Sequence, residues 1–157
     1  MADRKPFSVS VVTPDGPAYE GDAEMIVVPG AAGEIGVLAR HAPLVALLKS
    51  GSTRIHVRRT TDVREFATGP GFFKVEADRA LALVDDAVDV MQIDVSRAQT
   101  QLEDARAELE RIDGGEVEGD RWQAEQRLRH AENQLAVAGG GGGDTIRPKT
   151  TAGPEHL

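Results

Sequence analysis

The sequence contains no cysteine among its 157 residues. Disulfide bonds and thiolate chemistry are therefore excluded, and a zinc site would have to use histidines and carboxylates. Aromatic residues make up only 4% of the chain, so the 40% that is hydrophobic must build its core mainly from aliphatic side chains. No apolar run approaches the roughly 20 residues that cross a bilayer, so we expect no direct membrane insertion.

The chain has no excess of positive charge: 26 acidic residues outnumber 18 basic ones, so the formal net charge is -8. Nucleic-acid binding requires a concentrated basic face, so we expect no nucleic-acid partner. The first residues, MADRKPFSVSVV, contain neither the apolar core of a signal peptide nor an Arg/Ser-rich transit pattern. A cytosolic type of N-terminus is therefore expected.

The first part of the chain has the two-residue period of β-strands. Phe7, Val9 and Val11 occupy alternate positions, and so do the apolar residues of 54–58 (RIHVR). Turn-rich segments such as 14–17 (PDGP) and 69–71 (GPG) separate these runs. Several short strands at a spacing of about 8–12 residues are typical of a sandwich or barrel. The sequence therefore predicts an antiparallel β-sandwich domain over residues 1–88.

The period then changes to that of a helix. Small and apolar residues recur at spacings of 4, 3, 4 and 3 in two stripes: Ala98, Leu102, Ala105, Leu109 and Ile112, then Ala124, Leu128, Ala131, Leu135 and Ala138. This pattern predicts helices over 94–112 and 120–138, joined by the polar turn DGGEVEGD. Residues 89–138 are therefore interpreted as an antiparallel helical hairpin in which the alanines allow close approach.

The hairpin has only a narrow apolar stripe, and helices of this length depend on tertiary packing for stability. We therefore expect that it is held by contact with something else or can change position. Residues 139–157 begin with five glycines and continue with polar residues. They are predicted to form a disordered tail. The predicted fold class is a β-sandwich, a helical hairpin and a disordered Gly-rich tail.

The segment 29–51 (PGAAGEIGVLARHAPLVALLKSG) places glycines and prolines among apolar residues, which predicts a shaped surface of turns. It lacks the G-K-[ST] ending of a phosphate-binding loop. Its lone carboxylate, Glu34, has no second acid or histidine at a suitable local spacing for acid–base work. His41 and the other three histidines form no ligand pattern. We therefore expect no catalytic residue and no metal site.

Three motifs in this order resemble the epsilon subunit of the F-type ATP synthase, and the resemblance covers about residues 6–138. The first follows the family pattern G-E-x-G-x-L-x-x-H-x-P-L through Gly33, Glu34, Gly36, Leu38, His41, Pro43 and Leu44. The second, FFKVEADRALALVDDA from Phe72, is similar to the family's last strands. The third, IDVSRA at 93–98, is similar to the I/L-D-x-x-R-A motif that begins the first helix.

The resemblance implies a ten-stranded sandwich followed by two helices, in a non-catalytic subunit of the central stalk. Such a subunit couples gamma to the ring of c subunits in a proton-translocating enzyme. Its hairpin folds against the sandwich or extends toward the alpha and beta catalytic subunits, where it restrains ATP hydrolysis. The implied location is peripheral, on the cytoplasmic side of a bacterial cell membrane, although chloroplast homologues also lack transit peptides.

The resemblance also assigns candidate residues. It implies contacts with the c ring or gamma at Gly33, Glu34, Gly36, His41 and Pro43, and inhibitory contacts at Arg121, Arg127 and Arg129. It implies no cofactor, but it places Asp94 and Arg97 in a site for ATP as a regulatory ligand. Asp94 is equally explained as the N-cap of the first helix. Where ATP-binding members carry further basic residues, this chain has Asp104, His130 and Gln134.

Two alternatives remain open at the level of sequence. The chain could be a β-sandwich ligand-binding module whose hairpin dimerises as a four-helix bundle, since the stripe spacing permits it. The segment from Gly33 to Pro43 argues against this alternative, because a bundle does not require it. Trp122, at the start of the second helix, could be a packing anchor or an exposed contact for gamma.

Overall fold

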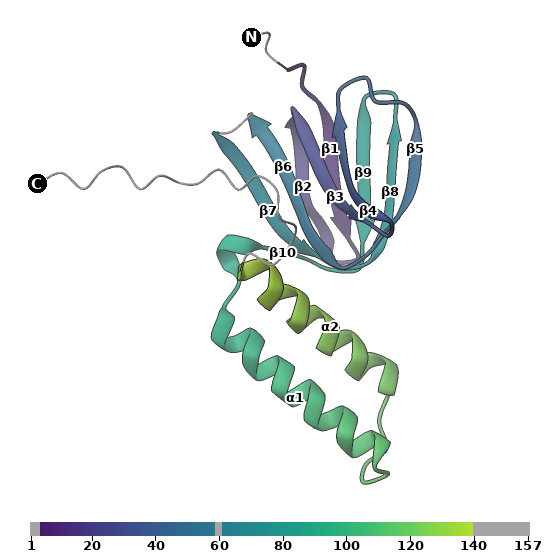
Figure 1. Cartoon of the computed structure of the whole chain (residues 1–157), viewed down its shortest axis with the longest axis vertical. Helices are drawn as coiled ribbons and strands as arrows, with labels where there is room; N and C mark the ends of the chain where they lie inside the picture. The colour runs from purple at the N-terminus through teal and green to yellow at the C-terminus, as the bar shows by residue number, and fades with distance from the viewer. Residues whose placement is uncertain (1–3, 59–60, 140–157) are drawn as a thin grey trace, which may run out of the picture.

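The computed structural model describes residues 4–58 and 61–139. Ten strands form a β domain, and two antiparallel helices lie beneath one end of it (Figure 1). The predicted disordered tail falls outside the described residues, apart from Gly139, which caps the second helix. The predicted boundary at residue 88 passes through the last strand, Ala87–Asp89.

The strands are short and are connected mostly by tight turns. They are β1 (Phe7–Thr13), β2 (Gly16–Ala23), β3 (Met25–Gly30), β4 (Gly33–Leu38), β5 (Leu44–Leu48), β6 (Gly51–Arg58), β7 (Asp62–Thr68), β8 (Gly71–Glu76), β9 (Arg79–Val84) and β10 (Ala87–Asp89). Their order is β10-β7-β6-β3-β5-β8-β9-β1-β2, with β4 paired to β3.

The strand pairs are antiparallel except that β1 runs parallel to β9. This pair departs from the predicted antiparallel arrangement. Parallel neighbours require a long connection, and here most of the β domain lies between the two strands in sequence.

The core is aliphatic with a few phenylalanines, as the composition predicts. The alternation of β1 buries Phe7, Val9 and Val11, which confirms the predicted period. Phe73 and other side chains from both layers complete the same cluster. Two buried hydroxyls satisfy each other, because the Oγ1 atoms of Thr53 and Thr68 lie 2.8 Å apart.

A 3-10 turn, η1 (Val90–Gln92), leads from β10 into α1 (Val95–Asp113), and α2 (Arg121–Ala138) follows. Both helices lie within one residue of the predicted ranges. Each begins after an aspartate that accepts a hydrogen bond from the third residue along: Asp94 Oδ1 from the Arg97 N–H at 3.0 Å, and Asp120 Oδ1 from the Gln123 N–H at 3.2 Å. The N-cap explanation of Asp94 is therefore confirmed.

The two helices pack through their alanines. Ala98 and Ala105 of α1 and Ala124 and Ala131 of α2 are buried, so the backbones approach closely. α2 also packs on β6, β7 and η1, which ties the hairpin to the sandwich. Trp122 is 66% exposed, so the packing-anchor alternative is wrong.

Candidate functional site

The residues predicted to form one surface of turns lie toward opposite ends of the sandwich. The segment contains two strands, β4 and β5, rather than turns alone. Gly33 begins β4, and His41 follows the other end of that strand, so β4 separates them by about 16 Å at ~3.3 Å per residue. The prediction of turns throughout was wrong because it took the glycines and prolines of 29–51, Gly36 among them, as turn residues. Gly36 instead pairs with Val27, while Ile35 and Val37 supply the alternation of a strand.

The β3–β4 turn requires glycine at both of its ends. Gly33 has a φ of +140°, which side chains rarely adopt. A Cβ added to Gly30 would lie 2.6 Å from the carbonyl oxygen of Gly33. Ala31 and Ala32 form the exposed tip between them. The turn is thus a tightly fixed, nearly uncharged protrusion.

Glu34 forms an ion pair inside the chain. Its two carboxylate oxygens accept hydrogen bonds from Arg54 Nη2 at 3.2 and 3.1 Å. Glu34 therefore lies on a strand, β4, and pairs with a cation of β6 that is distant in sequence. Its side chain remains 36% exposed, so a partner can still reach it.

His41 lies in the exposed loop at the other end of β4. Its Nδ1 is 2.6 Å from the carbonyl oxygen of Ala42, an atom that can only accept. The neighbouring Arg40 has a φ of 64°, and its N–H donates to Asp78 Oδ1 at 2.7 Å. These contacts tie both residues to the local backbone and to the Asp78 turn.

An exposed apolar row crosses three neighbouring strands. Leu47 of β5 lies opposite Phe72 of β8, and Phe72 lies opposite Leu83 of β9. Their exposed fractions are 60%, 58% and 48%. Val45, two residues before Leu47, is 72% exposed and extends the same face. We call these four residues the apolar row.

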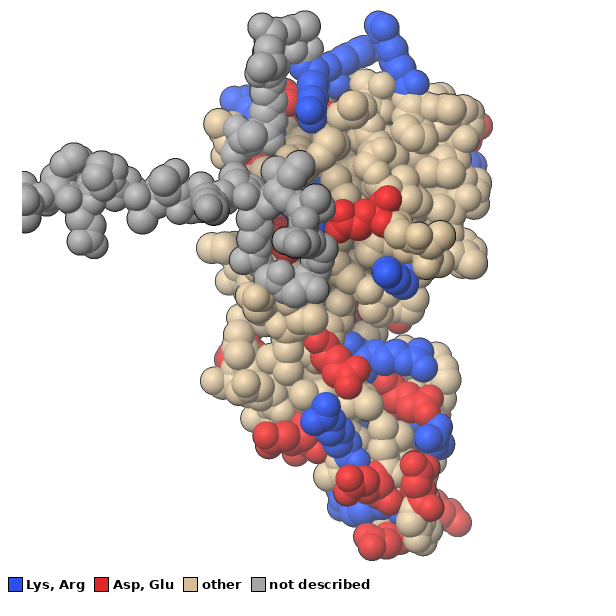
Figure 2. All heavy atoms as spheres, viewed as in Figure 1, with Lys and Arg blue, Asp and Glu red and all other residues tan. Residues whose placement is uncertain are grey.

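The sandwich is largely without charge on the face shown in Figure 2, whereas acids and bases alternate along the hairpin. The apolar row was not predicted from the sequence. The signal was the consecutive pair Phe72 and Phe73, since successive residues of a strand face opposite sides and one of them had to point outward.

A hollow of about 360 Å³ connects the β3–β4 turn to the apolar row. Residues 30–35 line one side of it, and Ala46 and Leu47 line the other. The turn and the row therefore form one continuous surface, although the two features come from different strands.

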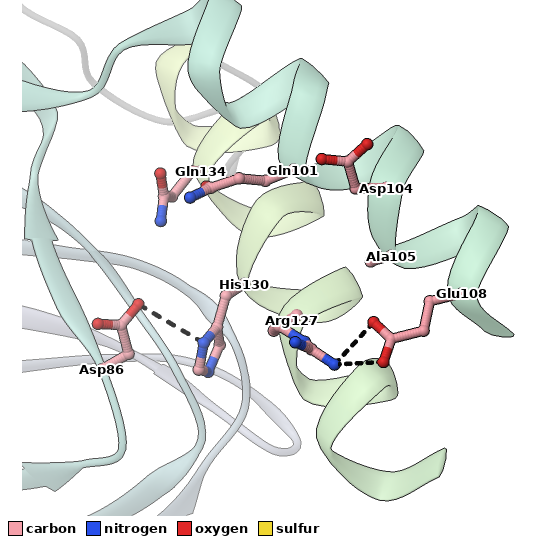
Figure 3. Close-up of a pocket in the computed structure, with 8 residues that line it drawn as sticks. All are labelled: Asp86, Gln101, Asp104, Ala105, Glu108, Arg127, His130 and Gln134. Carbon is pink, nitrogen blue, oxygen red and sulfur yellow. Dashed lines mark hydrogen bonds and ion pairs between the residues drawn. The ribbon is translucent and has the colours of Figure 1, made fainter. Parts of the chain in front are cut away.

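A second cavity, of about 340 Å³, lies between the hairpin and the sandwich (Figure 3). It is lined by Asp86, Gln101, Asp104, Ala105, Glu108, Arg127, His130 and Gln134. It therefore contains Asp104, His130 and Gln134, the three positions at which the resemblance implies basic residues in members that bind ATP. Asp94 and Arg97 do not line it.

The charges around this cavity are mostly negative. Arg127 donates two hydrogen bonds to Glu108, at 2.8 and 2.7 Å, so this cation is already paired. Burial raises the pKa of Asp86, while the nearby His130 opposes that rise. A triphosphate in the cavity would meet these carboxylates with little free positive charge to balance it.

The three arginines predicted to make inhibitory contacts differ in their pairing. Arg121 pairs with Asp113 at 2.9 Å and with Glu125, and Arg127 pairs with Glu108. Within the part of the chain that the structure describes, Arg129 has no ion pair. Of the three arginines, Arg129 is therefore the one that can pair with an acidic group of another protein without first leaving an internal partner.

Across the described ranges, no three His, Asp or Glu side chains are placed to hold a metal ion. Neither of the two described helices combines the length and the apolar composition that a membrane crossing demands.

Comparisons with known proteins agree with this geometry. Residues 6–90 match the family described as ATP synthase, Delta/Epsilon chain, beta-sandwich domain. An ATP synthase epsilon chain of Halalkalibacterium halodurans is 41% identical over 131 residues, covering 83% of this chain and 96% of the relative. One of Bacillus pumilus is 37% identical over 135 residues, covering 86% and 98%.

Among solved structures, a chain in the cryo-EM structure of the Euglena gracilis mitochondrial ATP synthase (OSCP/F1/c-ring in rotational state 1) has a TM-score of 0.67. It is 22% identical, and the match covers 87% of this chain and 84% of that one. At this identity the likeness supports the fold alone.

Proposed function

The chain belongs to the family of ATP synthase epsilon chains, and we propose that it is a non-catalytic stalk subunit that couples gamma to the c ring. The observation that carries the proposal is the apolar row. Exposed apolar side chains that run contiguously across a surface mark interaction sites. Four such residues stand together on β5, β8 and β9, and we assign them to gamma.

The β3–β4 turn is the proposed contact with the c ring. Its tip of two alanines presents backbone and little side chain, which suits close approach to another subunit. Gly33 and Gly36 let the chain approach the partner, and the half-exposed Glu34 supplies a polar contact beside the tip.

His41 and Pro43 lie too far from this turn to contact the same small surface. Pro43 immediately precedes β5, which carries Val45 and Leu47 of the apolar row. We therefore assign His41 and Pro43 to the gamma contact. The proposed surface then runs along β5 from one end of the sandwich to the other.

We assign the hairpin a regulatory role, in which it leaves the sandwich and restrains ATP hydrolysis through the alpha and beta subunits. Arg129 is available for such a contact at once, whereas Arg121 and Arg127 would first have to leave their acidic partners. The proposed location is peripheral, on the cytoplasmic side of a bacterial membrane, in an enzyme that translocates protons.

The test is the binding of purified chain to gamma after Phe72→Glu or Leu47→Glu. Each change places a charge in the apolar row without disturbing the core, so binding should weaken while the unfolding midpoint stays close to that of the parent. Val117→Glu is the matched control, because Val117 is also exposed but lies in the turn between the helices. Unchanged gamma binding by both row variants would refute the assignment. A stable homodimer in gel filtration that ignores the stalk would favour the dimerising module instead.

A further inference from the structure

The hairpin meets the sandwich through a small contact, which α2 makes with β6, β7 and η1. Near the C-terminal end of α2, Val137 is buried. Two polar side chains of α2, His130 and Asn133, reach the sandwich directly. Because the contact is small, the loss of a single residue's interaction can shift the equilibrium between the docked and the undocked hairpin.

Asn133 connects α2 to two strands at once. Its Nδ2 donates to the carbonyl oxygen of Thr68, at the end of β7, at 2.9 Å. The same nitrogen lies 3.4 Å from the carbonyl oxygen of Gly51, at the start of β6. Both oxygens belong to strand backbone that the sandwich holds in place. The side-chain amide of Asn133 therefore faces two acceptors at fixed positions.

His130 makes the neighbouring contact one helical turn earlier. Its Nε2 lies 3.4 Å from Asp85 Oδ2, and its Nδ1 lies 4.0 Å from Asp86 Oδ2. Figure 3 shows the imidazole pointing from α2 toward the sandwich carboxylate of Asp86. The two contacts together fix both the position and the rotation of α2 on the sandwich.

The cavity beside these contacts is poorly suited to a nucleotide that would hold the hairpin. Asp86, Asp104 and Glu108 place three carboxylates around it, and Arg127, the one arginine among the described residues that line it, is paired. Asp94 is occupied as a helix cap, and Arg97 is exposed outside the cavity.

We infer that Asn133 and His130 are the positioning residues that hold the hairpin on the sandwich, and that they do so without bound nucleotide. The inference goes beyond the proposed stalk function, because it concerns what keeps the regulatory element docked. It depends only on the hairpin being able to leave the sandwich, and it can be tested on the isolated chain.

The experiment uses the full chain carrying Asn133→Asp, which keeps the side-chain shape but turns a donor toward two carbonyls into a repelling carboxylate. Docking is followed by energy transfer between dyes on cysteines introduced at Arg79 and Glu118; the chain has no cysteine of its own. Amide hydrogen exchange in α2 provides a second readout. A lost hydrogen bond of this kind should speed α2 exchange by roughly 5- to 30-fold. His130→Gln should act in the same direction.

Glu132→Gln is the matched control. Glu132 lies next to Asn133 but is exposed, and its ion pair with Arg106 is long, at 3.9 Å. Exchange in the strands should be the same in all variants, which separates undocking from general loss of stability. Unchanged energy transfer and α2 exchange in Asn133→Asp would overturn the inference. So would restoration of docking in that variant by millimolar Mg-ATP.

Gamma binding by the same variants separates this inference from the proposed function. The apolar row does not involve the hairpin, so Asn133→Asp should bind gamma as the parent does. Loss of α2 docking with gamma binding retained supports the inference. Failure of the parent to bind gamma would count against the stalk function alone.

Discussion

Phe72 and Phe73 are consecutive on β8 and lie on opposite faces of the sheet, with exposed fractions of 58% and 0%. The same type of residue thus has two different roles at adjacent positions. Phe73 fills the core, while Phe72 stands in the apolar row.

The first prediction compares the two phenylalanines. Phe73→Ala should lower the free energy of unfolding by about 3–5 kcal/mol, since it empties a fully buried site. Phe72→Ala should change it by no more than about 0.5 kcal/mol, as is usual for surface positions. Urea denaturation measures both values, and equal losses would contradict the assignment of faces.

The second prediction concerns the ion pair of Glu34 and Arg54. Glu34→Arg should weaken assembly with the c ring, because it replaces an acid with a base beside the β3–β4 turn. The exchanged double variant, Glu34→Arg with Arg54→Glu, restores the internal pair but leaves the wrong charge at the contact. Binding should therefore stay weak in the double variant. Full recovery would show that Glu34 acts only inside the chain.

The third prediction compares two glycines of β4. Gly33→Ala forces a Cβ onto a φ of +140° and should cost on the order of 1–3 kcal/mol. Gly36→Ala meets nothing within 4 Å and should stabilise the strand by about 0.5–1 kcal/mol through reduced chain entropy. Thermal unfolding of the two variants and the parent measures these changes. A Gly33→Ala variant as stable as the Gly36→Ala variant would show that the turn does not need Gly33.

The fourth prediction concerns Asp86 and pH. Burial is the main reason that its pKa is raised above the ordinary 3.8. The folded chain therefore binds this proton more tightly than the unfolded chain does. The resulting stability is present below pH 3.8 and is lost as the pH rises through the folded-state pKa.

Asp86→Asn removes the titrating carboxyl, so the variant does not lose this stability as the pH rises. The variant should match the parent in acid and exceed it in unfolding free energy at neutral pH. Denaturation curves at a series of pH values measure the difference. A variant that is less stable at neutral pH would mean that the attraction between Asp86 and His130 outweighs the cost of burial.

Sequence patterns predicted the elements whose cause is local. The alternation of β1 and the alanine stripes of the hairpin follow from which face of a single element must be buried. Helix starts were predictable because Asp94 and Asp120 cap backbone N–H groups only three residues away. Composition likewise anticipated an aliphatic core, because few aromatic side chains were available to build one.

The site depended on relationships that no local pattern contains. Glu34 meets Arg54 across 20 residues, and Asn133 meets Thr68 across 65. Strand β4 carries Glu34 and His41 to different ends of the sandwich, although the sequence places them seven residues apart. Only strand register brings Leu47, Phe72 and Leu83 into one row. By itself the sequence determined which segments fold and which faces they bury, because those choices depend on neighbouring residues. The tertiary structure decided which surfaces a partner can reach, because that depends on the pairing of distant strands.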